Sequence, residues 1–150
     1  MLSEQFWKVI EAVDRTALDE GNEEGAVEGL TSMLAARGEA TMRAFTDKLA
    51  EALYALDGRA YADNAGESGE SDDGFLYARC YVVARGREFY EAVLANPAKM
   101  PTSVNRWCES LLYVAQNAWA EATGSEPGEW DYSAPLSYET GSNAAAWGER

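Results

Sequence analysis

The sequence predicts an all-α fold, an irregular array of about six helices followed by an extended, aromatic-rich C-terminal tail. Apolar residues recur at helical spacing through most of the first 124 positions. Clusters of Gly, Asn, Asp and Pro interrupt that spacing often enough to divide it into separate helices. Evidence for strands is poor, because the one short β-prone run, YVVA, lies inside a helical pattern.

Three apolar stripes account for the first half of the chain. The first follows Ser3, a residue suited to a helix N-cap, and the second follows Gly21 and Asn22. The third is the cleanest, with charged residues on its opposite side, and it ends at Asp57-Gly58. The apolar members of the three stripes are, in order, Phe6, Ile10 and Val13; Val27, Leu30 and Leu34; and Met42, Phe45, Leu49, Leu53 and Leu56.

Residues 58–71 are rich in Gly, Asp, Asn, Glu and Ser and are predicted as a loop, whose first part, RAYADNA, can continue as a short helical turn. Ser71 then provides an N-cap, and Asp72 and Asp73 provide first-turn carboxylates, for a helix over 72–85. The segment GREFYEAVLANP predicts another short helix, which its proline closes.

The helical pattern resumes after the turn at Met100-Pro101. Apolar residues over 104–119 keep helical register up to Gly124, either as one long helix or as two shorter ones. We therefore predict a single helical domain over residues 1–124.

Residues 125–150 form a separate C-terminal extension with no helical stripe before its alanine run. Its aromatic residues are too many for a free tail: Trp130, Tyr132, Tyr138 and Trp147. We expect this extension to lie extended across the helical domain and to pack on it, with a short strand pair within 130–139.

The composition is that of a folded domain without a membrane span. Hydrophobic residues make up 47% of the chain and charged residues 25%, which is ordinary globular usage rather than disorder. No apolar run approaches the roughly 18 residues that a membrane helix needs. The first residues, MLSEQFWKVIEAVD, lack a basic region and carry acids within their apolar stretch, unlike a secretion signal. The two cysteines have no CxxC spacing. We expect a cytoplasmic protein without a membrane partner.

The net charge of −14, from 26 acidic and 12 basic side chains, disfavours nucleic acid as a partner, because binding phosphates requires clustered Lys and Arg. The acids gather in three segments, 3–37, 57–74 and 124–150, whereas 75–123 is close to neutral. The simplest interpretation is acidity for solubility. A second interpretation is an acidic surface that is presented to a basic protein partner.

The absence of histidine removes the commonest general base, the commonest zinc ligand and any Ser-His or Cys-His pair. No GxGxxG or GxxxxGK[ST] phosphate loop is present. The acidic loop ESGESDDG resembles a calcium loop, but Gly69 and Cys80 would occupy its first and last ligand positions, and neither is a carboxylate. We expect no cofactor and no metal. The balance is against an enzyme, with carboxylate-based catalysis left open.

Arg79 is the most unusual residue of the predicted helix over 72–85. On a helical wheel it falls in the middle of the apolar arc that includes Phe75 and Val82. A guanidinium keeps its proton, so its burial is costly unless its N–H groups reach carboxylates or carbonyls. On one interpretation Arg79 forms a structural ion pair that pins the preceding loop to this helix. The carboxylates expected within its reach are Asp72, Asp73 and Glu88.

The alternative interpretation makes Arg79 an anion-binding group at the floor of a pocket. The residues expected to line that pocket are Tyr77, Arg87 and an aromatic side chain, either Trp7 or Trp107. Asp72 and Asp73 also have two interpretations. They cap the helix and complement its dipole, or they hold a divalent cation or share a proton.

The same residues carry a resemblance to a known family. The motif SDDGF followed by Arg79, the later GREF and NP, and LLYVA are similar to the bacterial domain-of-unknown-function family 4240, over about residues 1–124. Residues from Gly124 onwards look like an extension of the family's core. The loop GRAYADNAGESGE departs from the family pattern, because it lacks a Trp and a Cys that are typical there. The resemblance implies that Asp72, Asp73 and Arg79 belong to one motif, and it implies no activity.

Two functions remain open at this point. The first is a non-enzymatic protein-interaction or regulatory module, immunity-like in presenting an acidic surface to a basic protein. The alternative is a small-molecule or anion-binding domain, with or without enzymatic activity, centred on the Ser71–Gly74 loop and Arg79. An Arg79 exposed in a concave pocket would favour the alternative, whereas an Arg79 sealed among protein acceptors would favour the first.

Overall fold

The computed structural model describes residues 1–148, so residues 149 and 150 of the predicted extension lie outside the described part. The all-α prediction is confirmed, because the described residues form nine α-helices and four short 3₁₀ helices, with no strand. The α-helices are α1 (Ser3–Ile10), α2 (Arg15–Asp19), α3 (Glu23–Arg37), α4 (Glu39–Ala55), α5 (Arg59–Asp63), α6 (Asp72–Ala84), α7 (Arg87–Ala95), α8 (Val114–Thr123) and α9 (Ala144–Trp147). The 3₁₀ helices are η1 (Gly66–Glu70), η2 (Pro97–Lys99), η3 (Glu109–Tyr113) and η4 (Pro127–Glu129).

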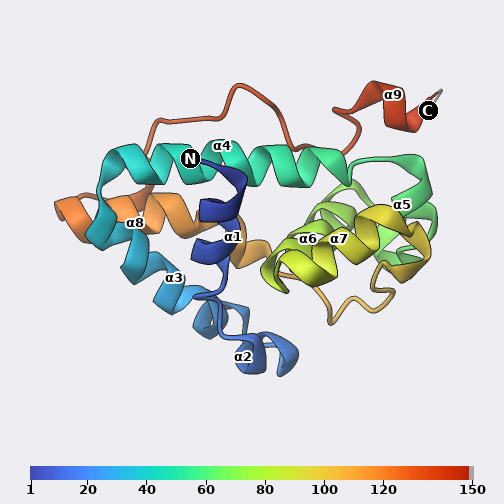
Figure 1. Cartoon of the computed structure of the whole chain (residues 1–150), viewed down its shortest axis with the longest axis horizontal. Coiled ribbons are helices and arrows are strands. Elements are labelled where there is room, and N and C mark those ends of the chain that lie inside the picture. The colour runs from blue at the N-terminus through green and yellow to red at the C-terminus, as the bar shows by residue number, and fades with distance from the viewer. Residues whose placement is uncertain (149–150) are drawn as a thin grey trace.

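Helix α4 is the longest element, and the other elements are arranged around it (Figure 1). Helices α3 and α8 lie side by side and both contact α4, and α1 crosses α4 (Figure 1). Helices α5, α6 and α7 gather at the carboxyl end of α4 (Figure 1). After η4 the chain runs along α4 without regular structure as far as α9, which contacts α5. The C-terminal residues therefore bridge the two ends of the helical body.

The predicted apolar stripes form the core, and the third one becomes α4, with Phe45 and Leu53 fully buried. Helix α6 begins as predicted, because the Ser71 hydroxyl accepts a hydrogen bond from the Gly74 N–H. The predicted Ser3 N-cap is wrong by one position, since Leu2 is the N-cap residue and Ser3 is already helical.

Two predictions about the second half of the chain need correction. Helical structure does not extend over 104–119, because residues 104–108 form an irregular segment and α8 begins only after η3. The backbone N–H of Cys108 instead bonds to the carbonyl of Tyr77 on α6, which holds the segment away from helical geometry. The predicted strand pair in 130–139 is also absent, and these residues form a single extended run on the helices.

Among the described residues, no helix combines the length and the apolar character that crossing a membrane requires.

Candidate functional site

The eight residues that the sequence singled out do not gather at one place. Arg79 lies inside the protein with none of its surface exposed. Trp7, Arg87 and Glu88 line an open pocket of about 710 Å³ beside α1 and α7. Trp107 belongs to a different pocket, between α2 and the segment before η3. Trp7, Arg87, Glu88 and Trp107 therefore do not share one pocket with Arg79.

Arg79 projects from α6 toward the carboxyl end of α4 and binds neutral acceptors. Its Nη1 donates to the carbonyl of Leu53 at 2.9 Å and to the carbonyl of Tyr138 at 3.0 Å. Its Nη2 donates to the hydroxyl of Thr140 at 3.0 Å. Its hydrogen bonds thus go to none of the carboxylates expected from the sequence, which were Asp72, Asp73 and Glu88. The physical reason is that the last carbonyls of a helix lack partners within it and carry partial negative charge, so the end of α4 attracts a buried cation.

The carboxyl end of α4 is closed by side chains from three other parts of the chain. The carbonyl of Ala52 accepts from the Tyr90 hydroxyl on α7 at 2.9 Å. Leu53 accepts from Arg79, and the carbonyl of Tyr54 accepts from Asn143 Nδ2 at 3.2 Å. The carbonyls of Leu53 and Tyr54 also accept from the backbone N–H groups of Leu56 and Asp57, so these side chains supply second donors at the helix end.

Asp57 is a second fully buried charge, which the sequence marked only as the end of a helix. Its Oδ1 accepts from the backbone N–H of Gly141 at 3.0 Å and from Trp147 Nε1 at 2.7 Å. Its Oδ2 accepts from the backbone N–H of Asn143 at 2.9 Å. Gly141 has a φ of 95°, a conformation that residues with a Cβ rarely adopt. One signal for this site was present in the sequence, because an acid directly after a helix opposes the helix dipole and needs strong donors.

The two buried charges act on each other as well as on the C-terminal residues. Burial lowers the pKa of the Arg79 guanidinium from its ordinary value, and the nearby Asp57 carboxylate opposes that shift. We call these two side chains, with the carbonyls of Leu53, Tyr54 and Asp72, the tail-binding site. Residues 138–147, which occupy it, are the C-terminal segment.

The C-terminal segment also bonds to the rim of the tail-binding site. The Thr140 hydroxyl, which accepts from Arg79, donates to the carbonyl of Asp72 at 2.7 Å. Trp147 is 9% exposed and packs edge-on against Phe75, with ring centroids 5.8 Å apart. Arg59 Nε donates to the carbonyl of Trp147 at 2.9 Å. The segment is therefore held by main-chain contacts, the Thr140 hydroxyl, the Asn143 amide and the Trp147 ring.

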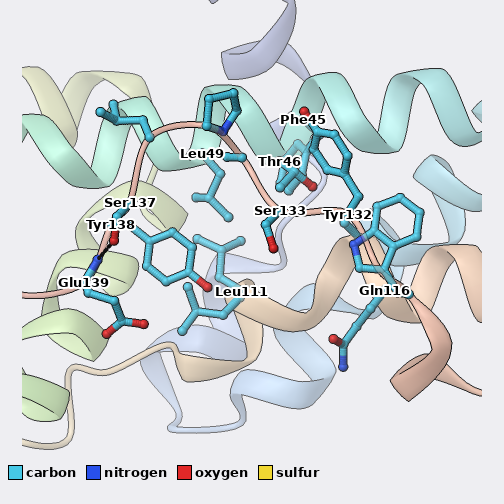
Figure 2. A pocket seen from close by; sticks show the side chains of 16 residues that line it. Phe45, Thr46, Leu49, Leu111, Gln116, Tyr132, Ser133, Ser137, Tyr138 and Glu139 are labelled. Carbon is cyan, nitrogen blue, oxygen red and sulfur yellow. Dashed lines mark hydrogen bonds between the residues drawn. The ribbon is translucent and has the colours of Figure 1, made fainter.

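Residues 130–139 approach the tail-binding site in an alternating pattern. Every second side chain is half-buried against the helices and the intervening ones are exposed, which is the pattern of an extended peptide lying on a surface. Tyr132 donates a hydrogen bond to Asp47 at 2.6 Å, and the Arg43 guanidinium lies over its ring. Beneath this run is a cavity of about 450 Å³, with Phe45 and Leu49 of α4 on its floor (Figure 2).

The SDDG motif has a structural explanation in this arrangement. Ser71 caps α6, and Asp72 and Asp73 stand in its first turn. A Cβ at Gly74 would lie 3.0 Å from the Ser68 carbonyl and 3.3 Å from the Trp107 ring, so only glycine fits without a shift. The Trp107 indole in turn donates to the buried Ser68 hydroxyl at 2.8 Å.

Trp107 also packs edge-on against Tyr77, with ring centroids 5.6 Å apart. Burial is the main cause that raises the pKa of the Tyr77 hydroxyl. These two aromatic side chains hold η1 and the segment before η3 against α6, and they do not face Arg79.

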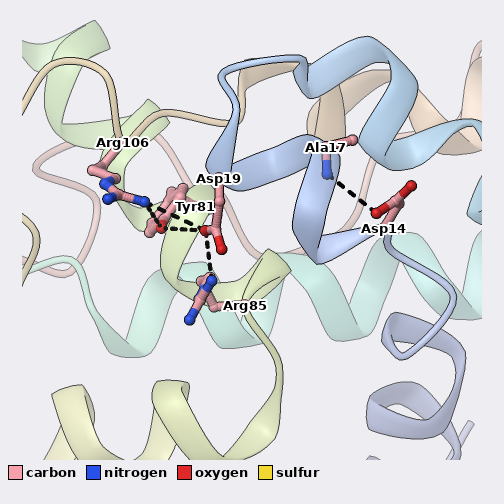
Figure 3. A network of polar contacts seen from close by, with 6 residues as sticks. All are labelled: Asp14, Ala17, Asp19, Tyr81, Arg85 and Arg106. Atoms are coloured by element: carbon pink, nitrogen blue, oxygen red, sulfur yellow. Dashed lines mark hydrogen bonds and ion pairs between the residues drawn. The ribbon is translucent and has the colours of Figure 1, made fainter.

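A further polar network joins α2, α6 and the segment before η3 (Figure 3). Asp19 Oδ1 accepts from Arg85 Nη1 at 2.6 Å, from Arg106 Nη1 at 3.4 Å and from the Tyr81 hydroxyl at 3.4 Å. Arg106 Nη1 also donates to the Tyr81 hydroxyl at 2.9 Å. The Asp19 side chain is 46% exposed, so solvent screens this network.

Within residues 1–148, no group of three or more Cys, Asp and Glu side chains is arranged to hold a metal ion.

A comparison with protein-family models matches residues 1–121 to the model described as "Protein of unknown function (DUF4240)". No curated protein and no solved structure matches the chain. The buried charges of the tail-binding site lie inside the matched residues, and the C-terminal segment lies outside them.

Proposed function

The chain belongs to the DUF4240 family, whose function is unknown, and from that premise we propose that it is a protein-interaction module of the bacterial cytoplasm. Its helical core binds an extended polypeptide segment at the tail-binding site. In this chain the site is occupied by the protein's own C-terminal segment, which a partner segment displaces.

The observation that carries the proposal is the set of bonds made by Asp57 and Arg79. Removal of the C-terminal segment takes away the three donors to the Asp57 carboxylate and two of the three acceptors of Arg79. Two charges that stand in an apolar interior need such partners, because a buried charge without them is strongly destabilising. Asp57 and Arg79 belong to the helical core, but most of their partners come from a segment that is distant in sequence. We therefore interpret the two charges as a binding site for that segment.

The chemistry of this site suits an extended peptide. A carboxylate that accepts backbone N–H groups and a guanidinium that donates to a backbone carbonyl recognise main chain, which every polypeptide presents. The hydroxyl of Thr140 and the indole of Trp147 supply the side-chain contacts that give specificity. The sealed position of Arg79 favours this function over the binding of a free anion at an open pocket.

The distribution of charge supports a basic partner. Of the 26 acidic and 12 basic side chains, five acidic and one basic lie in residues 124–150, which leaves a net charge of −10 on residues 1–123. The chain's own acidic C-terminal residues therefore bind to an acidic core. A basic segment would be steered to the same site by the opposite sign of its charge. The negative charge of the core therefore favours a regulatory or immunity-like role, in which the core binds a basic protein.

The proposal is tested by cutting the folded full chain before its C-terminal segment. A protease site is inserted at Gly128, which is exposed and has open space around it. After cleavage, a fluorescent peptide of residues 130–148 is added and its uptake is followed by anisotropy. We expect the core to stay folded and to exchange its fragment for the peptide. The matched control is Asp57→Asn in the same cleaved protein, which should lose uptake because a neutral amide accepts N–H bonds more weakly. A fragment that never exchanges, or that unfolds the core on leaving, would assign it a purely structural role.

A second candidate function is small-molecule binding, which the cavity beneath residues 130–139 favours (Figure 2). Its volume of about 450 Å³ and its apolar floor of Leu49 and Leu111 fall in the range of ligand pockets. A metabolite screen by thermal shift tests it, since a ligand at a hundred times its dissociation constant adds about 2.7 kcal/mol to the unfolding free energy. Ala115→Phe, which fills the cavity, is the control and should abolish any shift.

A further inference from the structure

Arg79 keeps two N–H groups without a hydrogen-bond partner, the Nε–H and one N–H of Nη2, although the C-terminal segment is in place. Both N–H groups of Nη1 are used, by the carbonyls of Leu53 and Tyr138. Nη2 donates to the Thr140 hydroxyl. The buried Nε has no partner. An unsatisfied donor of this kind is rare in a protein interior, because it loses its water without receiving an acceptor.

The missing acceptor belongs beside Thr140. In a guanidinium, the Nε–H and one Nη2–H point in the same direction and form a fork that matches the two oxygens of a carboxylate. Thr140 gives Nη2 a single oxygen, so Nε and the second N–H of Nη2 have no acceptor. The segment that fills the tail-binding site is therefore an incomplete match for Arg79.

An acidic side chain at position 140 would lose one bond and gain a better one. The Thr140 hydroxyl donates to the carbonyl of Asp72, and that contact is exposed, so water can replace it. The new bond to Nε would be buried and charge-assisted, which makes it stronger than the bond that is lost. Asp57 opposes the added negative charge, but its two oxygens already accept three N–H groups from the segment, and Arg79 donates its hydrogen bonds to other acceptors.

We infer that the partner segment that displaces the tail carries an aspartate where this chain has Thr140, and that its carboxylate binds the Nε and Nη2 of Arg79. The inference rests on the proposed function, because it names the chemistry of a partner for the same site. On this inference the C-terminal segment binds more weakly than the partner segment, which can therefore displace it.

The test uses the cleaved full chain and four peptides of residues 130–148: the natural sequence, Thr140→Asp, Thr140→Val and Thr140→Asn. We expect the aspartate peptide to dissociate about tenfold more slowly than the natural one, a difference of about 1.4 kcal/mol. The valine peptide keeps the shape of threonine but loses the hydroxyl, and it should dissociate faster than both. The Thr140→Asn peptide is the control for shape, because asparagine has the size of aspartate but no charge. It should dissociate faster than the aspartate peptide.

The outcomes separate the two proposals. If the natural peptide exchanges but the aspartate peptide binds no more tightly, the inference about the partner is wrong and the peptide-binding function stands. If no peptide exchanges, both are wrong. The variants should rank in the same way in the uncut protein. Thr140→Asp should slow proteolysis of the C-terminal segment, and Thr140→Val should accelerate it.

Discussion

The two ends of the helical body are closed by different physical means. Around α3 and α8 the interior is apolar, with Leu30, Leu34 and Val114 fully buried. Two of the three buried polar or charged side chains found in the described residues, Asp57 and Arg79, lie at the carboxyl end of α4. The first end is sealed by the helices themselves, and the second is sealed by the C-terminal segment.

The difference determines what each end contributes. Apolar burial is non-directional and roughly proportional to area, so many sequences of similar volume can satisfy it. Buried charges require particular partners at particular distances, and they destabilise the protein when one partner leaves. The α3–α8 end therefore supplies stability that does not depend on residues 138–147. The tail-binding site stabilises the protein only while a polypeptide segment occupies it, because its buried charges lose partners when the segment leaves.

The largest expected effect is that of Asp57→Ala, which leaves Arg79 as an uncompensated buried charge and strands three donors of the C-terminal segment. We expect the free energy of unfolding to fall by about 3–5 kcal/mol. Urea denaturation measures the loss, and limited proteolysis should show the C-terminal segment cut before the core. Asp47→Ala is the matched control, because Asp47 also bonds to the tail but is only half-buried. Equal losses in the two variants would contradict the distinction between the two ends.

Leu30→Ala tests the apolar end at a similar size of effect. The side chain is fully buried, so its truncation should lower the free energy of unfolding by about 3 kcal/mol. The surrounding apolar side chains can relax into part of the space, and no charge is exposed. The C-terminal segment should therefore stay protected from protease until the whole chain unfolds. Early release of the segment in this variant would show that the two ends are coupled.

The sequence predicted the apolar end better than the polar one, for a physical reason. Helical spacing of apolar residues reports a buried face directly, so α3, α4 and α6 were found together with their core residues. The same spacing located Arg79 inside the protein, and its full burial agrees with that prediction.

The partners of Arg79 were beyond the reach of local spacing. The expected carboxylates were neighbours in sequence, whereas two of the three observed acceptors are backbone carbonyls, which every residue carries. Asp57 was missed because its donors are about 84 to 90 positions away in the chain. The strand pair predicted within 130–139 does not form, because these residues follow one extended path over the helices and do not fold back on themselves.

Alkaline pH should act on the apolar interior through the cysteines. Burial raises the pKa of the Cys108 thiol from 9.0 to about 12. The unfolded chain therefore loses this proton more readily than the folded one, so the stability is complete below pH 9 and is lost as pH rises from about 9 to 12. Denaturation at several pH values should give a curve for Cys108→Ala that is flatter by up to about 1.4 kcal/mol per pH unit. Leu30→Ala is the control, since it should lower the curve without changing its slope.

The smallest effect is expected at Asp19, which compares most directly with Asp57. Each carboxylate accepts from three donors, but Asp19 is 46% exposed, whereas Asp57 has no exposed surface (Figure 3). Water solvates the charge of Asp19 in both the folded and the unfolded chain, so its bonds replace hydration of nearly equal strength. Asp19→Ala should lower the free energy of unfolding by less than about 1 kcal/mol, and added salt should shrink that difference further. A loss comparable to that of Asp57→Ala would mean that the number of donors, rather than burial, decides what a carboxylate contributes to this fold.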